Sequence, residues 1–236
     1  MKKTVIALLF MTYTTQLLFA QEQKKVEEKK NTFLIAPLNL LNFINPSIQV
    51  GYERLLSKKF AYQIEAGYII NHSLEEYIID WARGVKDCEY TNKGFIVKNE
   101  LKYFVIQKRK IKLYSSFEVF YLKNRSRNVG TFVISDPDYQ YSEPVPEGSN
   151  GYDDFFINDL QKIGLNIKFG VKIFPRARRF LFEPHIGLGI AFQNTKQYDR
   201  ENINDKLYDS FLDSHLKNGK SLVFSFPLNV KLGYRF

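Results

Sequence analysis

Three segments contain residue types that could do acid–base or nucleophilic chemistry. His185 follows Glu183 by two residues, so both fall on one face of an extended strand, where a Glu/His pair could transfer a proton. His72 and Ser73 are adjacent, and residues 213–215 read Asp-Ser-His. However, adjacent strand residues point to opposite sides, and proximity in sequence is no evidence for a triad. We therefore expect no catalytic residue, and interpret Glu183 and His185 as neighbours in a polar network.

Cofactor and nucleic-acid binding are also disfavoured. The sequence has no Cys/His cluster, phosphate-cradling glycine loop or acidic calcium repeat, so we expect no metal and no cofactor. Cys88 is the only cysteine, which excludes an internal disulfide framework. The formal net charge is +9 at pH 7. Without an aromatic-basic motif, this excess favours anionic lipid head groups over nucleic acid as a partner.

The strongest pattern lies in residues 221–236, where apolar or aromatic side chains occupy every second position. This alternation is typical of a strand with lipid on one side and a polar lumen on the other. Similar runs predict an all-β fold, an antiparallel up-and-down transmembrane β-barrel of about eight strands. The predicted strands are 31–40, 46–56, 60–71, 94–107, 111–134, 158–174, 180–195 and 221–236. Short basic turns alternate with long loops, the asymmetry of barrels with tight inner turns and longer outer loops.

The opposite faces of these strands carry charges that are expected to point into the lumen. Charges inside an apolar wall are costly unless paired, and an eight-stranded barrel has room for little beyond its own side chains. The near-balance of signs predicts interstrand ion pairs that fill the lumen. The predicted lumen network comprises Glu53, Glu65, Lys98, Glu100, Lys102, Glu118, Lys168, Lys172, Glu183, His185, Lys231 and Arg235.

The chain divides into three predicted parts. Residues 1–20 are expected to be a signal peptide, because Lys2 and Lys3 precede a short apolar run. The mixed-charge residues 21–30 are expected to form a periplasmic tether, and residues 31–236 the barrel domain. The predicted outer loops offer aromatic side chains for binding a ligand or partner, although tyrosines near an aromatic girdle would explain them equally well. These residues are Tyr77, Trp81, Tyr139, Tyr141, Tyr152 and Phe155.

The final segment, LNVKLGYRF, resembles the signal by which outer-membrane barrels are recognised for insertion, with Leu232, Tyr234 and Phe236 on the apolar face. Together with the repeated strands, it makes residues 31–236 similar to the small OmpA/OmpX-type barrels of Gram-negative bacteria. The resemblance implies an integral outer-membrane location and contact with outer-membrane lipid, lipopolysaccharide and the barrel assembly machinery. It also implies a non-enzymatic role in envelope structure or in binding an extracellular partner through loops.

Two alternatives remain open at this stage. One is a small barrel enzyme or carrier acting on outer-membrane lipid, since small enzymes that edit lipid A use a His/Ser pair near the outer rim, where His72 and Ser73 are expected. The other is a soluble lipocalin-like barrel that binds an apolar ligand. That fold would have its apolar faces inside, and these faces are too large for a small lumen.

Overall fold

The computed structural model describes residues 30–41, 46–70, 92–108, 110–135, 140, 150–175, 179–207 and 218–236. The predicted signal peptide and all of the predicted tether except Lys30 lie outside these residues. The described elements are β1 (Asn31–Ile35), the 3-10 helix η1 (Pro37–Leu41), β2 (Ser47–Leu55), β3 (Phe60–Ile69), β4 (Asn92–Gln107), β5 (Ile111–Val133), β6 (Gly151–Ile173), β7 (Phe180–Tyr198), β8 (Lys206–Leu207), β9 (Gly219–Ser225) and β10 (Leu228–Arg235).

The strands form a closed antiparallel barrel, which confirms the predicted fold class. Each strand from β1 to β6 pairs with the next, and β10 joins β7 to β1. β9 and β10 are two halves of the eighth strand, because β9 pairs with residues 189–195 of β7 and β10 with residues 180–186. The predicted strand 221–236 is therefore interrupted at Phe226 and Pro227, although the Gly187 N–H still donates to the Pro227 carbonyl at 2.8 Å.

Two strand boundaries differ most from the sequence prediction. The first strand ends at Ile35 instead of residue 40, because Pro37 cannot donate a ladder hydrogen bond and opens a 3-10 turn. β6 begins at Gly151, so its loop is shorter than the predicted one; residues 151–157 all pair with β5. Among the described residues, no helix is long and apolar enough to cross a membrane.

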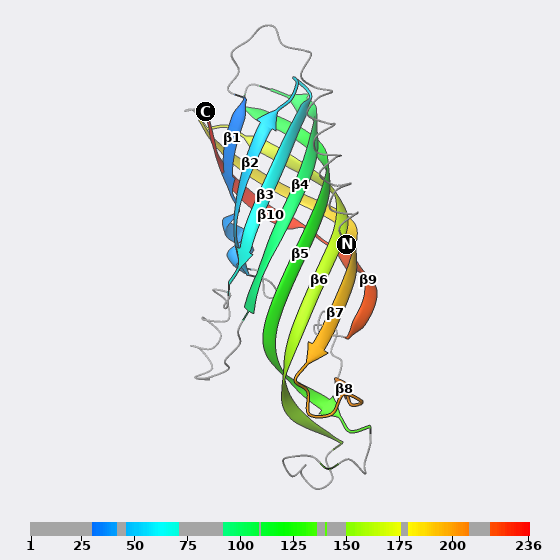
Figure 1. Ribbon diagram of the computed structural model, residues 1–236. Coiled ribbons are helices and arrows are strands. Elements are labelled where there is room, and N and C mark those ends of the chain that lie inside the picture. The colour runs from blue at the N-terminus through cyan, green and yellow to red at the C-terminus, as the bar shows by residue number, and fades with distance from the viewer. Residues whose placement is uncertain are drawn as a thin grey trace, which may run out of the picture.

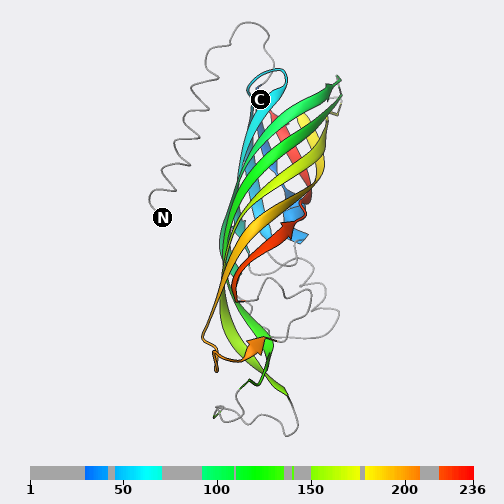
Figure 2. The same ribbon diagram turned by 90° about the vertical axis from the view of Figure 1, so that its right-hand side faces the viewer.

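The barrel wall differs greatly in height around its circumference. β5 and β6 each have 23 residues, whereas β1 has only 5. In Figures 1 and 2 the strands from β5 to β7 extend far below the ring of short strands, at the end opposite the C-terminus. We call β4–β7 with β9 the tall wall. The short connections 56–59, 108–110 and 174–179 lie at the end that carries Phe236 and Lys30.

Apolar side chains cover the outside of the barrel. On β6, Ile163, Leu165, Ile167, Phe169 and Ile173 are all exposed. From Ile163 to Ile173 the strand rises about 33 Å, and a tilt of roughly 40° reduces this to about 25 Å along the barrel axis. That height equals the apolar band of about 25 Å on outer-membrane barrels. The outward positions match those that the alternation predicts.

The inside is filled by aromatic rings set against glycines. Tyr114 faces Gly170 across β5 and β6, and a Cβ atom at Gly170 would lie 2.4 Å from the tyrosine ring. Phe120 faces Gly164 in the same way, and a Cβ atom at Gly164 would lie 2.5 Å from the phenylalanine ring. Each glycine thus leaves the space that its neighbour's ring occupies, which lets large side chains fill a narrow, strongly curved barrel.

Candidate functional site

Register alone brings the charged residues together in the lumen. A continuous cross-strand row runs from β2 to β6, with each member directly opposite the next. Its members are Glu53, Gln63, Glu100, Glu118 and Asn166. All five are buried, and three of them are carboxylates. Since such a row repels itself, the cations of neighbouring rows must lie between the carboxylates.

The inner cluster lies nearer the short turns and contains two lysines and two carboxylates. Lys102 Nζ donates to Glu53 Oε2 at 2.9 Å, to Gln63 Oε1 at 2.5 Å and also to Glu183. Lys172 donates to Glu53 and lies 3.4 Å from Glu183 Oε2. The Tyr114 hydroxyl donates to Glu183 Oε1 at 2.7 Å. Every charge in this cluster therefore has at least one partner of opposite sign.

The outer cluster contains three carboxylates and three lysines. Lys168 bridges the two opposed carboxylates of β4 and β5, at 2.7 Å from Glu100 Oε2 and 2.5 Å from Glu118 Oε2. Lys231 pairs with Glu65 and lies 3.2 Å from Glu100 Oε2. Lys98 lies 3.9 Å from the other Glu65 oxygen.

Both clusters are electrically neutral, and neutral side chains complete them. Ser116 donates to Glu100 at 2.6 Å, and Asn166 donates to Glu118 at 2.8 Å. Together with Gln63 and Tyr114, these are the residues that charge-based sequence reasoning missed. Their inward strand positions would have revealed them, because each has the same parity as a predicted charge on its strand.

The two remaining predicted lumen residues lie beside these clusters. His185 is buried and faces inward, but its Nδ1 atom has no hydrogen-bond partner. Arg235 lies at the inner mouth, with its guanidinium 5.5 Å from the centre of the Phe174 ring. Within the described residues, no group of three or more His, Cys, Asp or Glu side chains could hold a metal ion.

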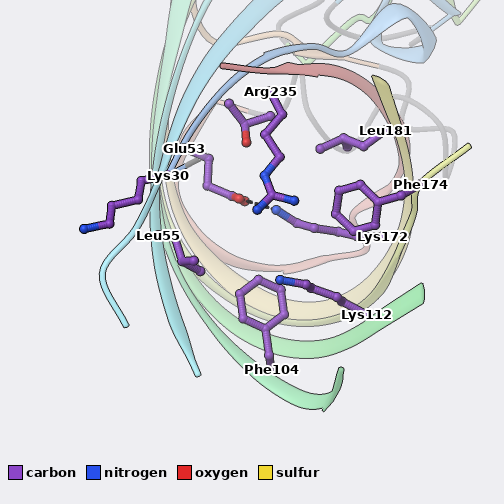
Figure 3. Close-up of a pocket in the computed structure, with 10 residues that line it drawn as sticks. Lys30, Glu53, Leu55, Phe104, Lys112, Lys172, Phe174, Leu181 and Arg235 are labelled. Atoms are coloured by element: carbon purple, nitrogen blue, oxygen red, sulfur yellow. Dashed lines mark hydrogen bonds and ion pairs between the residues drawn. The ribbon is translucent and has the colours of Figure 1, made fainter. Parts of the chain in front are cut away.

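A pocket opens next to the inner cluster, at the end of the barrel that carries the short connections; we call this end the inner mouth. It contains about 300 Å³ of empty space, part of it open to solvent, and Leu55, Phe104 and Leu181 form part of its lining. In Figure 3, Glu53, Lys172 and Arg235 point toward one another inside the ring of strands. Glu53 and Lys172, which form an ion pair, also line this pocket, so the inner cluster forms part of its wall.

The predicted loop-binding residues have different outcomes. Tyr77, Trp81, Tyr139 and Tyr141 lie outside the described residues, as do His72, Ser73 and the 213–215 tripeptide. Tyr152 packs against Phe132, and its hydroxyl donates to Asp205 at 2.9 Å, so this tyrosine joins the ends of β5 and β6 to the segment that contains Asp205. Phe155 is 52% exposed, with the Arg127 guanidinium 5.2 Å from its ring centre.

The three residues of the predicted insertion signal face outward or lie at the inner end. Leu232 and Tyr234 are exposed on β10, and the Tyr234 ring lies edge-on to Phe180 with centroids 5.4 Å apart. Phe236 is exposed, and its N–H donates to the Asn31 carbonyl at 3.0 Å.

Comparison with known proteins gives a similarity to solved structures. No protein-family model matches the sequence, and no curated protein matches it. Among solved structures, a major outer membrane protein from Thermus thermophilus is similar over 87% of this chain and 99% of its own, with 11% sequence identity and a TM-score of 0.39. The fold assignment therefore depends on the strand pairing within this chain.

Proposed function

We propose that this protein is an integral outer-membrane β-barrel with a closed lumen, a non-enzymatic envelope protein that presents its tall hairpin outside the cell. The observation that carries the proposal is the inverted polarity of the barrel, with apolar side chains outside and a neutral, ion-paired network inside. A soluble lipocalin-like barrel would have the opposite polarity. An outer-membrane barrel requires apolar side chains outside and polar side chains inside, because its wall faces lipid.

The orientation follows from the connections. In outer-membrane barrels the short turns and both termini lie in the periplasm, and the longer loops face outward. The β5–β6 hairpin would then rise beyond the membrane by about a dozen residues per strand, or roughly 40 Å along each strand.

The described end of this hairpin, residues 132–135 of one arm and 150–156 of the other, is packed. Phe132 and Phe156 are buried against each other, and the Arg200 guanidinium lies 4.5 Å from the centre of the Phe132 ring. Asp205 accepts from the Ser135 N–H at 2.9 Å, and β8 pairs with the end of β5. A packed hairpin end of this kind is suited to presenting a fixed surface to an extracellular partner.

A heat-shift gel on purified outer membranes tests the location and the fold. Folded outer-membrane barrels resist unheated detergent, so we expect a band in the membrane fraction that changes mobility after boiling. A soluble periplasmic protein without a mobility shift would overturn the proposal and favour a soluble ligand-binding barrel.

Conductance across a planar lipid bilayer tests the closed lumen. Because the two ion-pair clusters lie across the lumen in succession, we expect no steady ion current from the inserted wild-type protein. Protein unfolded by boiling and added at the same concentration is the control for leakage that does not depend on insertion. A stable unitary current from the folded protein alone would show that the lumen conducts and would contradict the proposal.

A further inference from the structure

Six exposed cations lie on the outer surface of the tall wall, immediately beyond the apolar band. We call them the outer collar; its members are Lys93, Lys123, Arg125, Arg127, Lys196 and Lys220. They come from four strands, β4, β5, β7 and β9, and all occupy outward positions. Among the described residues, a single carboxylate, Asp159 of β6, lies between them, so the collar has a net charge of +5.

Strand register places these cations side by side. Lys93 lies directly opposite Arg125, which lies opposite Asp159, which in turn lies opposite Lys196. Neighbouring strands are about 4.8 Å apart, so this row spans roughly 15 Å of the wall. Like charges in directly opposed positions destabilise a sheet on their own. Asp159 can compensate only one of the three cations in this row, so the row keeps an excess of positive charge that an external anion could neutralise.

The collar begins where the apolar band ends. The row just below it is entirely apolar or aromatic and crosses the tall wall from β4 to β9. Its members are Val97, Tyr121, Ile163, Phe192 and Leu222. The rings of Phe95 and Tyr121 pack at this boundary, 5.8 Å apart, as aromatic residues do at a membrane interface. On the short wall, the last outward residues of β2 and β3 are Ile48 and Tyr68, which carry no charge.

We propose that the outer collar binds the phosphate groups of the outer-leaflet glycolipid, lipopolysaccharide, along the tall wall. This inference depends on the proposed outer-membrane location and orientation. The collar lies at the depth of head groups, and its positive charge complements phosphate, for which arginine is the preferred bidentate partner. The lipid's acyl chains would lie against the apolar row beneath. The short wall would contact the same lipid without this attraction.

The test uses the folded full-length protein in phosphatidylcholine nanodiscs. Binding of bisphosphorylated lipid A and of its dephosphorylated form is compared for the wild type and for the triple variant Lys123→Gln, Arg125→Gln, Lys196→Gln. One charge near a membrane surface contributes about fivefold in affinity, so the triple variant should bind the bisphosphorylated form on the order of 100-fold more weakly. Binding of the dephosphorylated form should be unchanged.

The matched control removes three cations from the inner turns, Lys58→Gln, Lys59→Gln and Lys108→Gln, which are equally exposed. This variant should retain wild-type affinity. Two results would overturn the inference. One is an equal loss of affinity in both triple variants, and the other is equal affinity of the wild type for the bisphosphorylated and dephosphorylated forms of lipid A. Equal binding of phosphatidylglycerol would show a general anionic-lipid surface and would also overturn it. The heat-shift gel separates the proposed outer-membrane location from the proposed lipid A binding. If the wild-type protein shifts in the membrane fraction but fails the binding test, only the binding inference is overturned.

Discussion

Lysines occupy two contrasting environments in this barrel. In the lumen, Lys102 and Lys168 are almost completely buried, and each touches two carboxylates. In the outer collar, Lys93 and Lys123 are exposed, and Lys93 lies opposite another cation. The lumen clusters sum to zero charge, whereas the collar sums to +5. The same side chain therefore serves internal packing in one place and offers a surface for an external anion in the other.

The difference follows from desolvation. A buried charge costs several kcal/mol in free energy unless a partner compensates it, so the sequence must supply that partner within the fold. An exposed charge keeps its water and requires no partner for folding. A cluster of exposed like charges thus contributes little to stability and is free to serve binding. The predictions below test this contrast, from the largest expected effect to the smallest.

Removing one lysine from the inner cluster should have the largest effect. In Lys102→Met, Glu53 loses one of its two lysine contacts, Glu183 loses a donated hydrogen bond, and Gln63 loses a donor. We expect the free energy of unfolding in a lipid bilayer to fall by about 3–5 kcal/mol. Urea titration followed by far-ultraviolet circular dichroism measures it. Lys123→Met in the collar is the matched control, and equal destabilisation of the two variants would remove the contrast.

A double-mutant cycle sharpens the same comparison in the outer cluster. Lys168→Met removes the lysine that pairs with Glu118, and Glu118→Gln removes one of the two carboxylates that pair with Lys168, whereas the double variant removes both charges together. Its destabilisation should be smaller than the sum of the single effects by about 1–3 kcal/mol. The corresponding cycle in the collar, Lys93→Gln with Arg125→Gln, should show a small coupling of the opposite sign. Additive effects at Lys168 and Glu118 would show that their contact is unimportant.

Space in the lumen is a second constraint. Gly170→Ala places a methyl group 2.4 Å from the Tyr114 ring, which cannot move freely because its hydroxyl donates to Glu183. We expect a loss of about 1–3 kcal/mol in the free energy of unfolding, measured by the same urea titration. Adding Tyr114→Leu should make the alanine nearly neutral. If Gly170→Ala is equally harmful with leucine at position 114, the ring does not set the constraint.

The sequence predicts much of this architecture because lipid imposes one simple rule. Alternation with a period of two identifies both faces of each strand, and burial inside a narrow lumen makes charge pairing necessary. Which charges pair was not predictable, since Lys102 and Glu183 are 81 residues apart and meet only through register and barrel closure. The break at Pro227 preserves the alternation on both sides, so the pattern did not reveal it.

The start of β6 was the least predictable part of the tall wall. Residues 151–157 are polar or aromatic without a clear apolar face, because this part of β6 lies beyond the proposed lipid and has no constraint from it. It was therefore predicted as loop. The collar was missed for a related reason. Its cations are scattered over 128 residues of sequence, from Lys93 to Lys220. Only the successive pairing of β4 with β5, β5 with β6, β6 with β7 and β7 with β9 brings them together.

The smallest expected effect concerns the single acid described within the collar. Asp159 lies opposite both Arg125 and Lys196, and its Oδ1 atom has no hydrogen-bond partner. Asp159→Asn keeps the shape and removes the negative charge, so the free energy of unfolding should stay within about 0.5 kcal/mol of the wild type. Affinity for bisphosphorylated lipid A in nanodiscs should rise about fivefold. A gain in affinity from one substitution is difficult to attribute to damage of the fold. A fall in affinity would mean that Asp159 orients the two cations, and the collar would then act through geometry instead of net charge.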